Sequence, residues 1–98
     1  MFIVLLSYVQ PLSAVEAHLQ EHRAFLDRHY AAGHFVASGA QVPRTGGVIL
    51  ARGLTRPQLD EVLAEDPFYR EQVAQYQVIE FVPSKFAPGV EALLQPQA

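Results

Sequence analysis

The sequence predicts a single α+β domain, in which a four-stranded antiparallel sheet carries two helices on one face. Three observations predict this class. The chain has 98 residues, half of them hydrophobic, which is the size of one domain. Its apolar segments follow the order strand, helix, strand, strand, helix, strand. Right-handed crossovers fold that order into one sheet with both helices on the same side. We therefore expect one domain over residues 1–98, with a core over 1–83 and a tail over 84–98.

The first strand and the first helix have the clearest signals. Residues 2–9 are apolar on both alternating faces, which favours a central strand. Ser13 and Glu16 have the spacing of a capping box, and Gly33 provides a stop, so one helix is expected over 13–33. The stripe of this helix that should face the core consists of Val15, Leu19, Leu26 and Tyr30, with His22 at its edge and His18, Phe25 and His29 on the flank.

A β-hairpin follows the first helix. Strands are expected over residues 34–39 and 47–52. The connection over 41–46 contains Pro43 and Gly46, which are typical of turns.

A second helix and a last strand complete the pattern. Thr55 should cap the helix, with Pro57 in its first turn and Gln58 at the capping-box position. Its buried side consists of Leu59, Val62 and Leu63. Pro67 disfavours helical geometry at Asp66, so the helix should end about there and be followed by one irregular turn over residues 68–70.

The last strand is expected over residues 75–82, with apolar side chains on both faces. One face carries Tyr76, Val78 and Val82, and the other carries Ile79 and Phe81. In the tail, the apolar residues 90–94 are expected to dock as a single turn.

The predicted topology is the ferredoxin-like βαββαβ arrangement. Its first and last strands are apolar on both faces, yet two helices cover only one face of the sheet. The open face would be an exposed apolar patch unless another copy covers it, so we expect a homodimer through sheet faces. A small-molecule ligand would bind between the sheet and the helices, or where two sheets meet.

Composition excludes several classes of partner and site. The net charge is −3, the sequence pI is about 5.7, and the seven basic residues are scattered, so no nucleic-acid partner is expected. The chain has no cysteine, which excludes disulfides and Cys-based zinc sites. The apolar run over residues 2–6 is too short to span a membrane, so no membrane partner is expected and a cytoplasmic location is the default.

His22 and Asp66 form the candidate catalytic pair. In this topology the first helix and the end of the second lie side by side. A carboxylate that accepts a hydrogen bond from one imidazole nitrogen fixes the tautomer and makes the other nitrogen more basic. The alternative interpretation is structural: His22 lies at the edge of the core, and Asp66 is a turn residue before a proline.

A metal site is the second hypothesis that the first helix raises. His18 and His22 are four residues apart, with Glu21 beside the second, a pattern that can place both rings on one metal. Neither Glu65 nor Glu80 is an evident third ligand, so we expect no metal.

The hairpin contains a candidate binding segment for substrate oxygens. Ser38 and Arg44 supply a hydroxyl and a positive charge, and successive amides at Gly46 and Gly47 could form an anion-binding concavity. Hairpins also use glycine for backbone reasons alone. No glycine-rich nucleotide-binding pattern is present in the sequence.

Four fragments, in this order, resemble one known family. They are HRAFL at residues 22–26, GHFVASG at 33–39, TGGVI at 45–49 and DPF at 66–68. On these fragments the chain resembles the YCII-related (YciI-like) family over nearly its whole length. The resemblance implies the dimeric α/β-barrel form of the fold and a pocket with a histidine–aspartate dyad, which here matches His22 and Asp66. Many members have Gly-Pro where this chain has Gly39-Ala40, which implies a different pocket rim.

One branch of this family eliminates chloride from a chlorinated hydroxyquinol, but the resemblance identifies no reaction for this chain. An acid–base pair alone is enough for an elimination or an isomerisation, so we interpret the chain as a small enzyme without a cofactor. We therefore expect lyase or isomerase chemistry on a hydroxylated aromatic or enolic acid, with His22 as the general base and Asp66 orienting it. The alternative is a binding or accessory module in which the same pair only orients a ligand.

Overall fold

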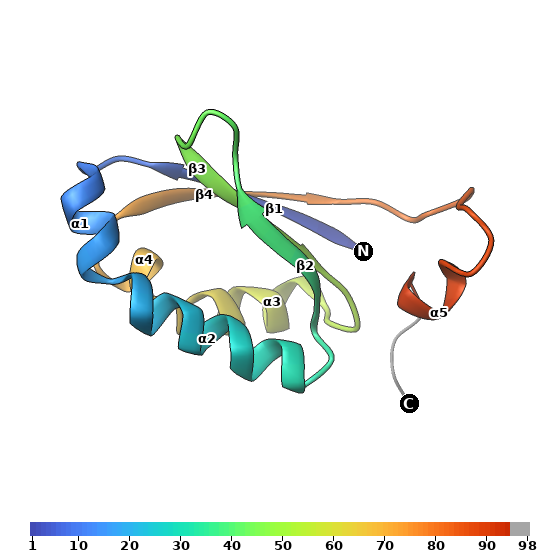
Figure 1. Ribbon diagram of the computed structural model, residues 1–98. Helices are drawn as coiled ribbons and strands as arrows, with labels where there is room; N and C mark the ends of the chain where they lie inside the picture. The colour runs from blue at the N-terminus through green and yellow to red at the C-terminus, as the bar shows by residue number, and fades with distance from the viewer. Residues whose placement is uncertain (95–98) are drawn as a thin grey trace.

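The computed structural model describes residues 1–94 and contains the predicted four-stranded antiparallel sheet, with the longer helices packed on one face (Figure 1). The strand order is β2-β3-β1-β4, so the first strand is central, as its two apolar faces predict. The strands begin and end within two residues of the expected positions: β1 is Phe2–Tyr8, β2 is Phe35–Ala40, β3 is Gly46–Ala51 and β4 is Ala74–Glu80.

The expected first helix is two helices, which corrects the single helix predicted over residues 13–33. Helix α1 (Leu12–Ala17) ends at His18, whose φ of −108° and ψ of 4° leave the helical region, and α2 is Leu19–Ala31. The His18 amide donates to the Val15 carbonyl three residues back, which is the tight turn that ends α1. Ser13 does not cap the helix: the N-cap position is Pro11, which provides no side-chain hydrogen bond.

The break at His18 changes which side chains of α2 face the core. Phe25 and His29 are its buried residues, whereas both are predicted to lie on the flank of the stripe. Tyr30, predicted to be buried, is 37% exposed. The prediction was wrong because it continued one helical phase through His18, where the backbone leaves the helix.

The end of α2 matches the sequence signal. Gly33 adopts a φ of 80°, its amide donates to the Tyr30 carbonyl, and the His34 amide donates to the His29 carbonyl. These two bonds form a Schellman motif, which satisfies carbonyls at the helix end.

The remaining helices confirm the predicted second helical segment. Helix α3 is Arg56–Leu63, with a complete capping box between Thr55 and Gln58. Its buried residues are the predicted Leu59, Val62 and Leu63. The irregular turn expected after it is a four-residue helix, α4 (Pro67–Arg70), and Asp66 is its N-cap.

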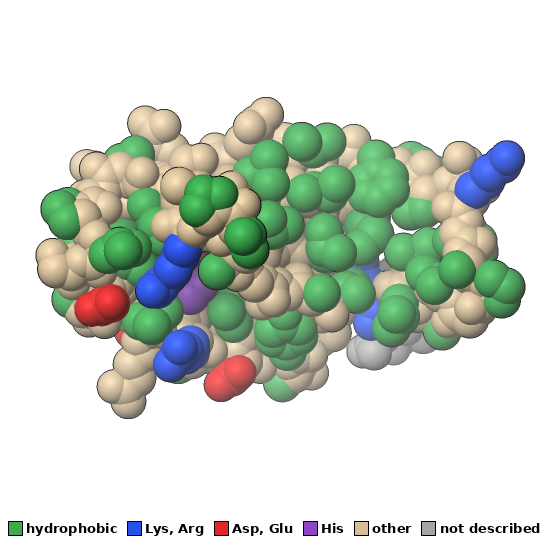
Figure 2. Space-filling model, turned by 45° about the horizontal axis from the view of Figure 1, so that its top comes forward, with side chains coloured by type: hydrophobic (Ala, Val, Ile, Leu, Met, Phe, Trp, Pro, Cys, Tyr) green, Lys and Arg blue, Asp and Glu red, His purple; other side chains and the backbone are tan. Residues whose placement is uncertain are grey.

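The two faces of the sheet differ in how they are covered. On β1, Phe2, Val4 and Leu6 are buried under the helices, while the alternate residues Ile3 and Leu5 are only partly buried. Figure 2 shows hydrophobic side chains gathered on the uncovered face. On β4, Tyr76 and Val78 pack against the core and Ile79 is 41% exposed, which confirms the predicted division. Val82 lies beyond the end of β4 and is 86% exposed, which corrects its placement in the strand on the same face as Tyr76 and Val78.

The tail forms an arm that extends beyond β4 and ends in the short helix α5 (Glu91–Leu94), the predicted single turn. Arg52, a buried residue just after β3, donates through Nη1 to the carbonyls of Ala92 and Leu93 at 3.1 and 2.9 Å. The part of the expected tail after residue 94 lies outside the described residues.

Candidate active site

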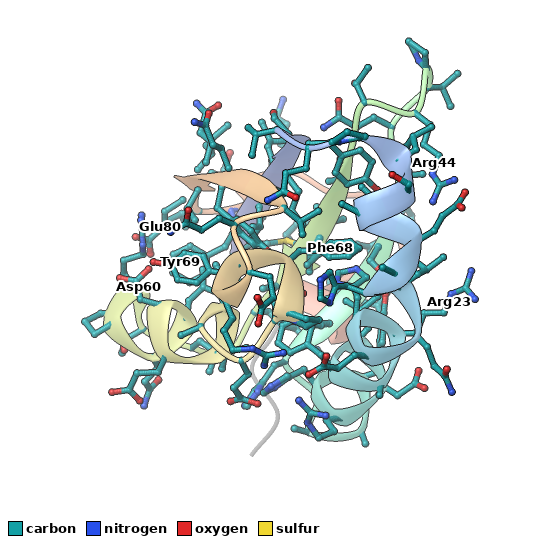
Figure 3. The ribbon with its side chains drawn as sticks, turned by 90° about the vertical axis from the view of Figure 1, so that its left-hand side faces the viewer. Arg23, Arg44, Asp60, Phe68, Tyr69 and Glu80 are labelled. Atoms are coloured by element: carbon teal, nitrogen blue, oxygen red, sulfur yellow. The ribbon has the colours of Figure 1, made fainter. Side chains whose placement is uncertain are left out.

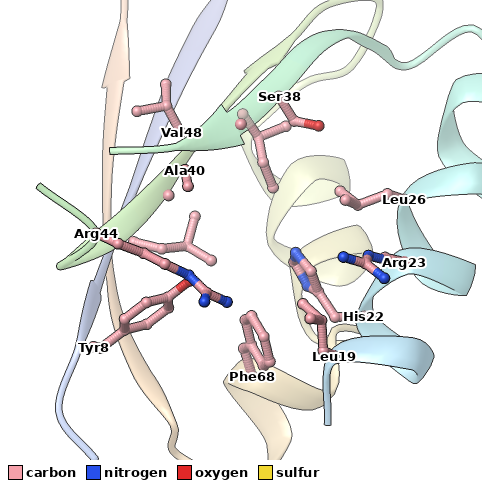
Figure 4. A pocket seen from close by; sticks show the side chains of 14 residues that line it. Tyr8, Leu19, His22, Arg23, Leu26, Ser38, Ala40, Arg44, Val48 and Phe68 are labelled. Carbon is pink, nitrogen blue, oxygen red and sulfur yellow. The ribbon is translucent and has the colours of Figure 1, made fainter. Parts of the chain in front are cut away.

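A cavity of about 450 Å³ lies between the sheet and the helices α2 and α4 (Figure 4). This volume is within the range of small-molecule sites. Its lining combines apolar walls with a few polar groups. The lining residues are Leu6, Tyr8, Leu19, His22, Arg23, Leu26, Ser38, Gly39, Ala40, Arg44, Gly47, Val48, Ile49 and Phe68.

His22 and Asp66 are in contact at this cavity. His22 comes from the first turns of α2, and Asp66 precedes α4, 44 residues later. The His22 Nδ1 atom lies 2.8 Å from Asp66 Oδ1. The imidazole also stacks on the Phe68 ring, with centroids 4.1 Å apart and planes at 9°. Two helices and one ring stack therefore hold the His22 side chain in place.

The Asp66 carboxylate is fully buried and has three hydrogen-bond partners. Besides His22, the backbone amide of Phe68 donates to Oδ1 at 3.0 Å, as expected for an N-cap residue. The Tyr76 hydroxyl donates to Oδ2 at 2.5 Å. Because buried charge is costly unless it is paired and hydrogen-bonded, this set of donors explains how the interior holds a carboxylate.

These bonds determine which nitrogen of His22 faces the cavity with a free lone pair. An ionised carboxylate only accepts hydrogen bonds, so we assign the hydrogen to Nδ1 of His22. In the neutral ring, Nε2 is then the basic nitrogen. The hydrogen bonds formed among residues 1–94 include none at Nε2, and the ring lines the cavity. The arrangement presents an oriented proton acceptor to a bound molecule.

Tyr76 supports the pair from behind. Burial, together with the negative charge and the hydrogen bond of Asp66, raises the pKa of the Tyr76 phenol above its ordinary value near 10. The phenol therefore remains a hydrogen-bond donor over the whole neutral range.

The predicted substrate-binding residues are placed at the cavity with one exception. Ser38, Arg44 and Gly47 line it. The Ser38 hydroxyl lies 2.7 Å from the Tyr30 hydroxyl. Gly46 is buried outside the lining, where a Cβ would lie 1.7 Å from the Leu6 carbonyl oxygen. Close packing of β3 against β1 therefore requires glycine at this position.

Sequence reasoning missed three residues of this site. Tyr8 lines the cavity and contacts Phe68 edge to face, with ring centroids 6.1 Å apart. Because residues two apart on a strand share a face, its position after Leu6 on β1 could have predicted that it faces the helices. Tyr76 was predicted only as a residue on one face of the last strand, although a buried phenol needs a hydrogen-bond partner. Arg23 also lines the cavity. The helical periodicity of the sequence gave no signal for it, because adjacent residues of a helix do not lie on one face.

The metal hypothesis finds no support in the geometry. Among residues 1–94, no group of three or more His, Asp or Glu side chains is placed to hold a metal ion. His22 directs Nδ1 to Asp66, and His18 is not among the residues of the cavity.

The comparison with family models decides the family. The model of the YCII-related domain matches residues 1–82. The chain belongs to the YCII-related domain family. No curated protein matches the sequence in a direct comparison.

Among solved structures, this YCII-related chain is similar to 5-chloro-2-hydroxyhydroquinone dehydrochlorinase (TftG) from Burkholderia phenoliruptrix AC1100, in complex with 2,5-dihydroxybenzoquinone. The TM-score is 0.69 at 15% sequence identity, and the match covers 84% of this chain and 94% of that one. The likeness supports the α+β ferredoxin-like fold. Within residues 1–94, no helix is long and apolar enough to cross a membrane.

Proposed function

We propose that this protein is a cofactor-independent small-molecule enzyme in which His22 acts as the general base. One observation carries the proposal: the same imidazole ring bonds a fully buried carboxylate through Nδ1 and borders a cavity with its other side. Proton transfer by a positioned side chain typically contributes about 10²–10⁴-fold to a rate, which is enough to make this pair the centre of a reaction.

The proposed reaction is an elimination or an isomerisation of a hydroxylated aromatic or enolic acid. In the elimination, Nε2 of His22 accepts the proton of an enolic hydroxyl, and the O–H bonding pair becomes the new C=O bond. The conjugated double bond shifts by one position, and a halide leaves with its bonding pair from the saturated carbon next to that double bond, so that the elements of HX are lost. An aromatic substrate first takes its keto tautomer, in which the halogen-bearing ring carbon has gained a hydrogen and is saturated. In the isomerisation, the proton returns from Nε2 to another carbon of the same molecule.

Asp66 stabilises the imidazolium that forms when His22 takes the proton, because it lies 2.8 Å from Nδ1. Ser38 and Arg44 are proposed to position the substrate's oxygens from the opposite wall of the cavity. The likeness to a dehydrochlorinase that binds 2,5-dihydroxybenzoquinone supports a cyclic, oxygen-rich substrate of this size.

We also propose that the enzyme is a homodimer through the uncovered face of the sheet. Partly exposed apolar side chains on β1 and β4, including Leu5 and Ile79, support this arrangement. An exposed apolar patch of that kind in a chain of 98 residues favours association with a second copy.

The test of the catalytic role is the variant His22→Ala, measured with 5-chloro-2-hydroxyhydroquinone and a panel of halogenated enolic acids. We expect chloride release to fall by about 10²–10⁴-fold, with an unchanged circular dichroism spectrum. His18→Ala is the matched control, because it removes a histidine four residues earlier that does not line the cavity. The control should retain wild-type turnover. Unchanged turnover in folded His22→Ala protein contradicts the proposal.

The pH dependence separates the enzyme from the alternative, a metabolite-binding module. A general base gives a rate that rises with pH as the imidazole loses its proton, because only the neutral ring accepts one. Binding of 2,5-dihydroxybenzoquinone without chloride release from any member of the panel would assign the protein to the binding class instead.

A further inference from the structure

Two arginines border the same cavity on either side of His22. Arg23 follows His22 on α2, and Arg44 lies in the connection between β2 and β3. In Figure 4 the His22 ring lies between the two guanidinium groups. Figure 3 shows both arginines along the same side of the molecule, and both line the cavity.

Neither arginine has a carboxylate partner among residues 1–94, which distinguishes them from arginines elsewhere. Arg56 lies 3.0 Å from Asp60, Arg70 lies 2.6 Å from Glu21, and Arg28 lies 3.6 Å from Glu65. At the cavity no aspartate or glutamate belongs to the lining.

The lining of the cavity therefore carries two positive charges on a protein with a net charge of −3, while the Asp66 carboxylate lies behind His22, is fully buried and does not face the cavity. Figure 2 shows basic side chains beside a histidine in the hollow at one end of the molecule. A cleft lined by one sign of charge focuses the field and concentrates ligands of the opposite sign. Two arginines without carboxylate partners in the described part of the chain leave room for two anionic groups, since each guanidinium can bond a carboxylate in a bidentate manner.

We propose that the ligand of this site is a small planar dianion, with one anionic oxygen group bound by Arg23 and the other by Arg44. Its body lies against the apolar walls formed by Leu19, Leu26 and Phe68. This inference rests on the proposed function for the statement that the reacting atom lies at Nε2 of His22. Arg23 then selects substrates by charge, a role that no sequence pattern indicated.

The experiment compares three molecules of the same shape by isothermal titration calorimetry: benzene-1,4-dicarboxylate, 4-carbamoylbenzoate and benzene-1,4-dicarboxamide. Affinity should increase with each charge, by about 5- to 20-fold per charge for partly exposed arginines. Arg23→Gln and Arg44→Gln should each remove one such step, and the double variant should remove both. Arg56→Gln, a matched substitution at an arginine outside the cavity, should leave all three affinities unchanged.

Three results would overturn the proposal. The first is no detectable binding of the dicarboxylate at about 10 mM, which is weaker than any working small-molecule site. The second is equal affinity for the dicarboxylate and the dicarboxamide. The third is a double variant that keeps the charge preference. This result overturns the proposal even if the double variant has a different oligomeric state.

The same titrations separate this inference from the proposed catalytic role. Binding requires no turnover, so His22→Ala should keep the preference for the dianion whether or not it loses chloride release. If the charge preference is found and His22→Ala keeps its turnover, only the proposed role of His22 as the general base is contradicted. If His22→Ala loses turnover and no charge preference is found, only the proposed binding of a dianion is contradicted.

Discussion

Asp66 shows how one residue can join the fold to the candidate chemistry. Its Oδ1 caps α4 through the Phe68 amide and also bonds His22, while Oδ2 accepts from Tyr76. Removal of any donor leaves part of a buried carboxylate unsatisfied, at a cost of about 1–3 kcal/mol or more. Stability and the orientation of His22 therefore depend on the same carboxylate.

The variant Tyr76→Phe tests this dependence. At pH 7 we expect the free energy of unfolding to fall by about 1.5–3 kcal/mol, because a hydrogen bond to a charged buried group is lost. At high pH the difference in the free energy of unfolding between wild type and Tyr76→Phe should become smaller. Since the pKa of Tyr76 is raised in the folded protein, the unfolded phenol loses its proton first, near pH 10, and wild-type stability falls as pH rises further. The fall contributed by this tyrosine is at most about 1.4 kcal/mol per pH unit.

Urea unfolding between pH 7 and pH 11 measures both effects. The gap between wild type and Tyr76→Phe should be constant near neutrality and shrink above pH 10. Tyr69→Phe is the control, because that ring is 52% exposed and packs edge-on against Tyr76. A gap that stays constant or widens above pH 10 would show that the fold does not hold the proton on Tyr76 more tightly than the unfolded chain does.

At the residue scale, the contact between His22 and Asp66 could be predicted from the sequence, whereas several of the residues around this pair could not. His22 and Asp66 could be paired because the topology places the first helix beside the end of the second. Arg23 could not be assigned, since adjacent residues of a helix do not share one face, yet both His22 and Arg23 reach the cavity. The exclusion of Gly46 from the cavity depends on the distance of β3 from β1, which no local pattern contains.

At the element scale, the capping-box signal correctly predicted the start of α3 and was wrong for α1. Thr55 and Gln58 form both bonds of the capping box on α3. Ser13 and Glu16 have the same spacing, yet α1 begins one residue earlier, after Pro11. The break at His18, where φ is −108° and ψ is 4°, has no glycine or proline to mark it in the sequence.

The variant Thr55→Ala measures what the capping box contributes to α3. The Thr55 side chain accepts from the Gln58 amide at 3.3 Å, and the Gln58 side chain accepts from the Thr55 amide at 2.9 Å. We expect a loss of about 1 kcal/mol in the free energy of unfolding, within a range of about 0.5–2 kcal/mol. Thr45→Ala, at an exposed threonine of the hairpin, should change it by less than about 0.5 kcal/mol. Equal losses in the two variants would mean that the cap is not significant for stability.

At the scale of the whole molecule, the fold is one-sided. The helices cover the face of the sheet that carries Phe2, Val4 and Leu6, and the opposite face is apolar but uncovered in the single chain. The sequence predicted this asymmetry because the first and last strands are apolar on both faces. The C-terminal arm extends the apolar surface, since Phe81 and Phe86 are 40% and 47% exposed.

The variant Leu5→Lys tests the proposed homodimer, since Leu5 lies at the middle of the uncovered face, opposite Val48 on one side and Gln77 on the other. Stable interfaces bury about 1,200–2,000 Å² in total, and a charge at the centre of such an area loses its hydration without gaining a partner. Light scattering after size-exclusion chromatography should give a dimer for the wild type and a monomer for Leu5→Lys, both with the same circular dichroism spectrum. Val42→Lys, at a hairpin residue that is 98% exposed, should remain a dimer. A monomeric wild type would contradict the homodimer, and a dimeric Leu5→Lys protein would place the interface on another surface of the chain.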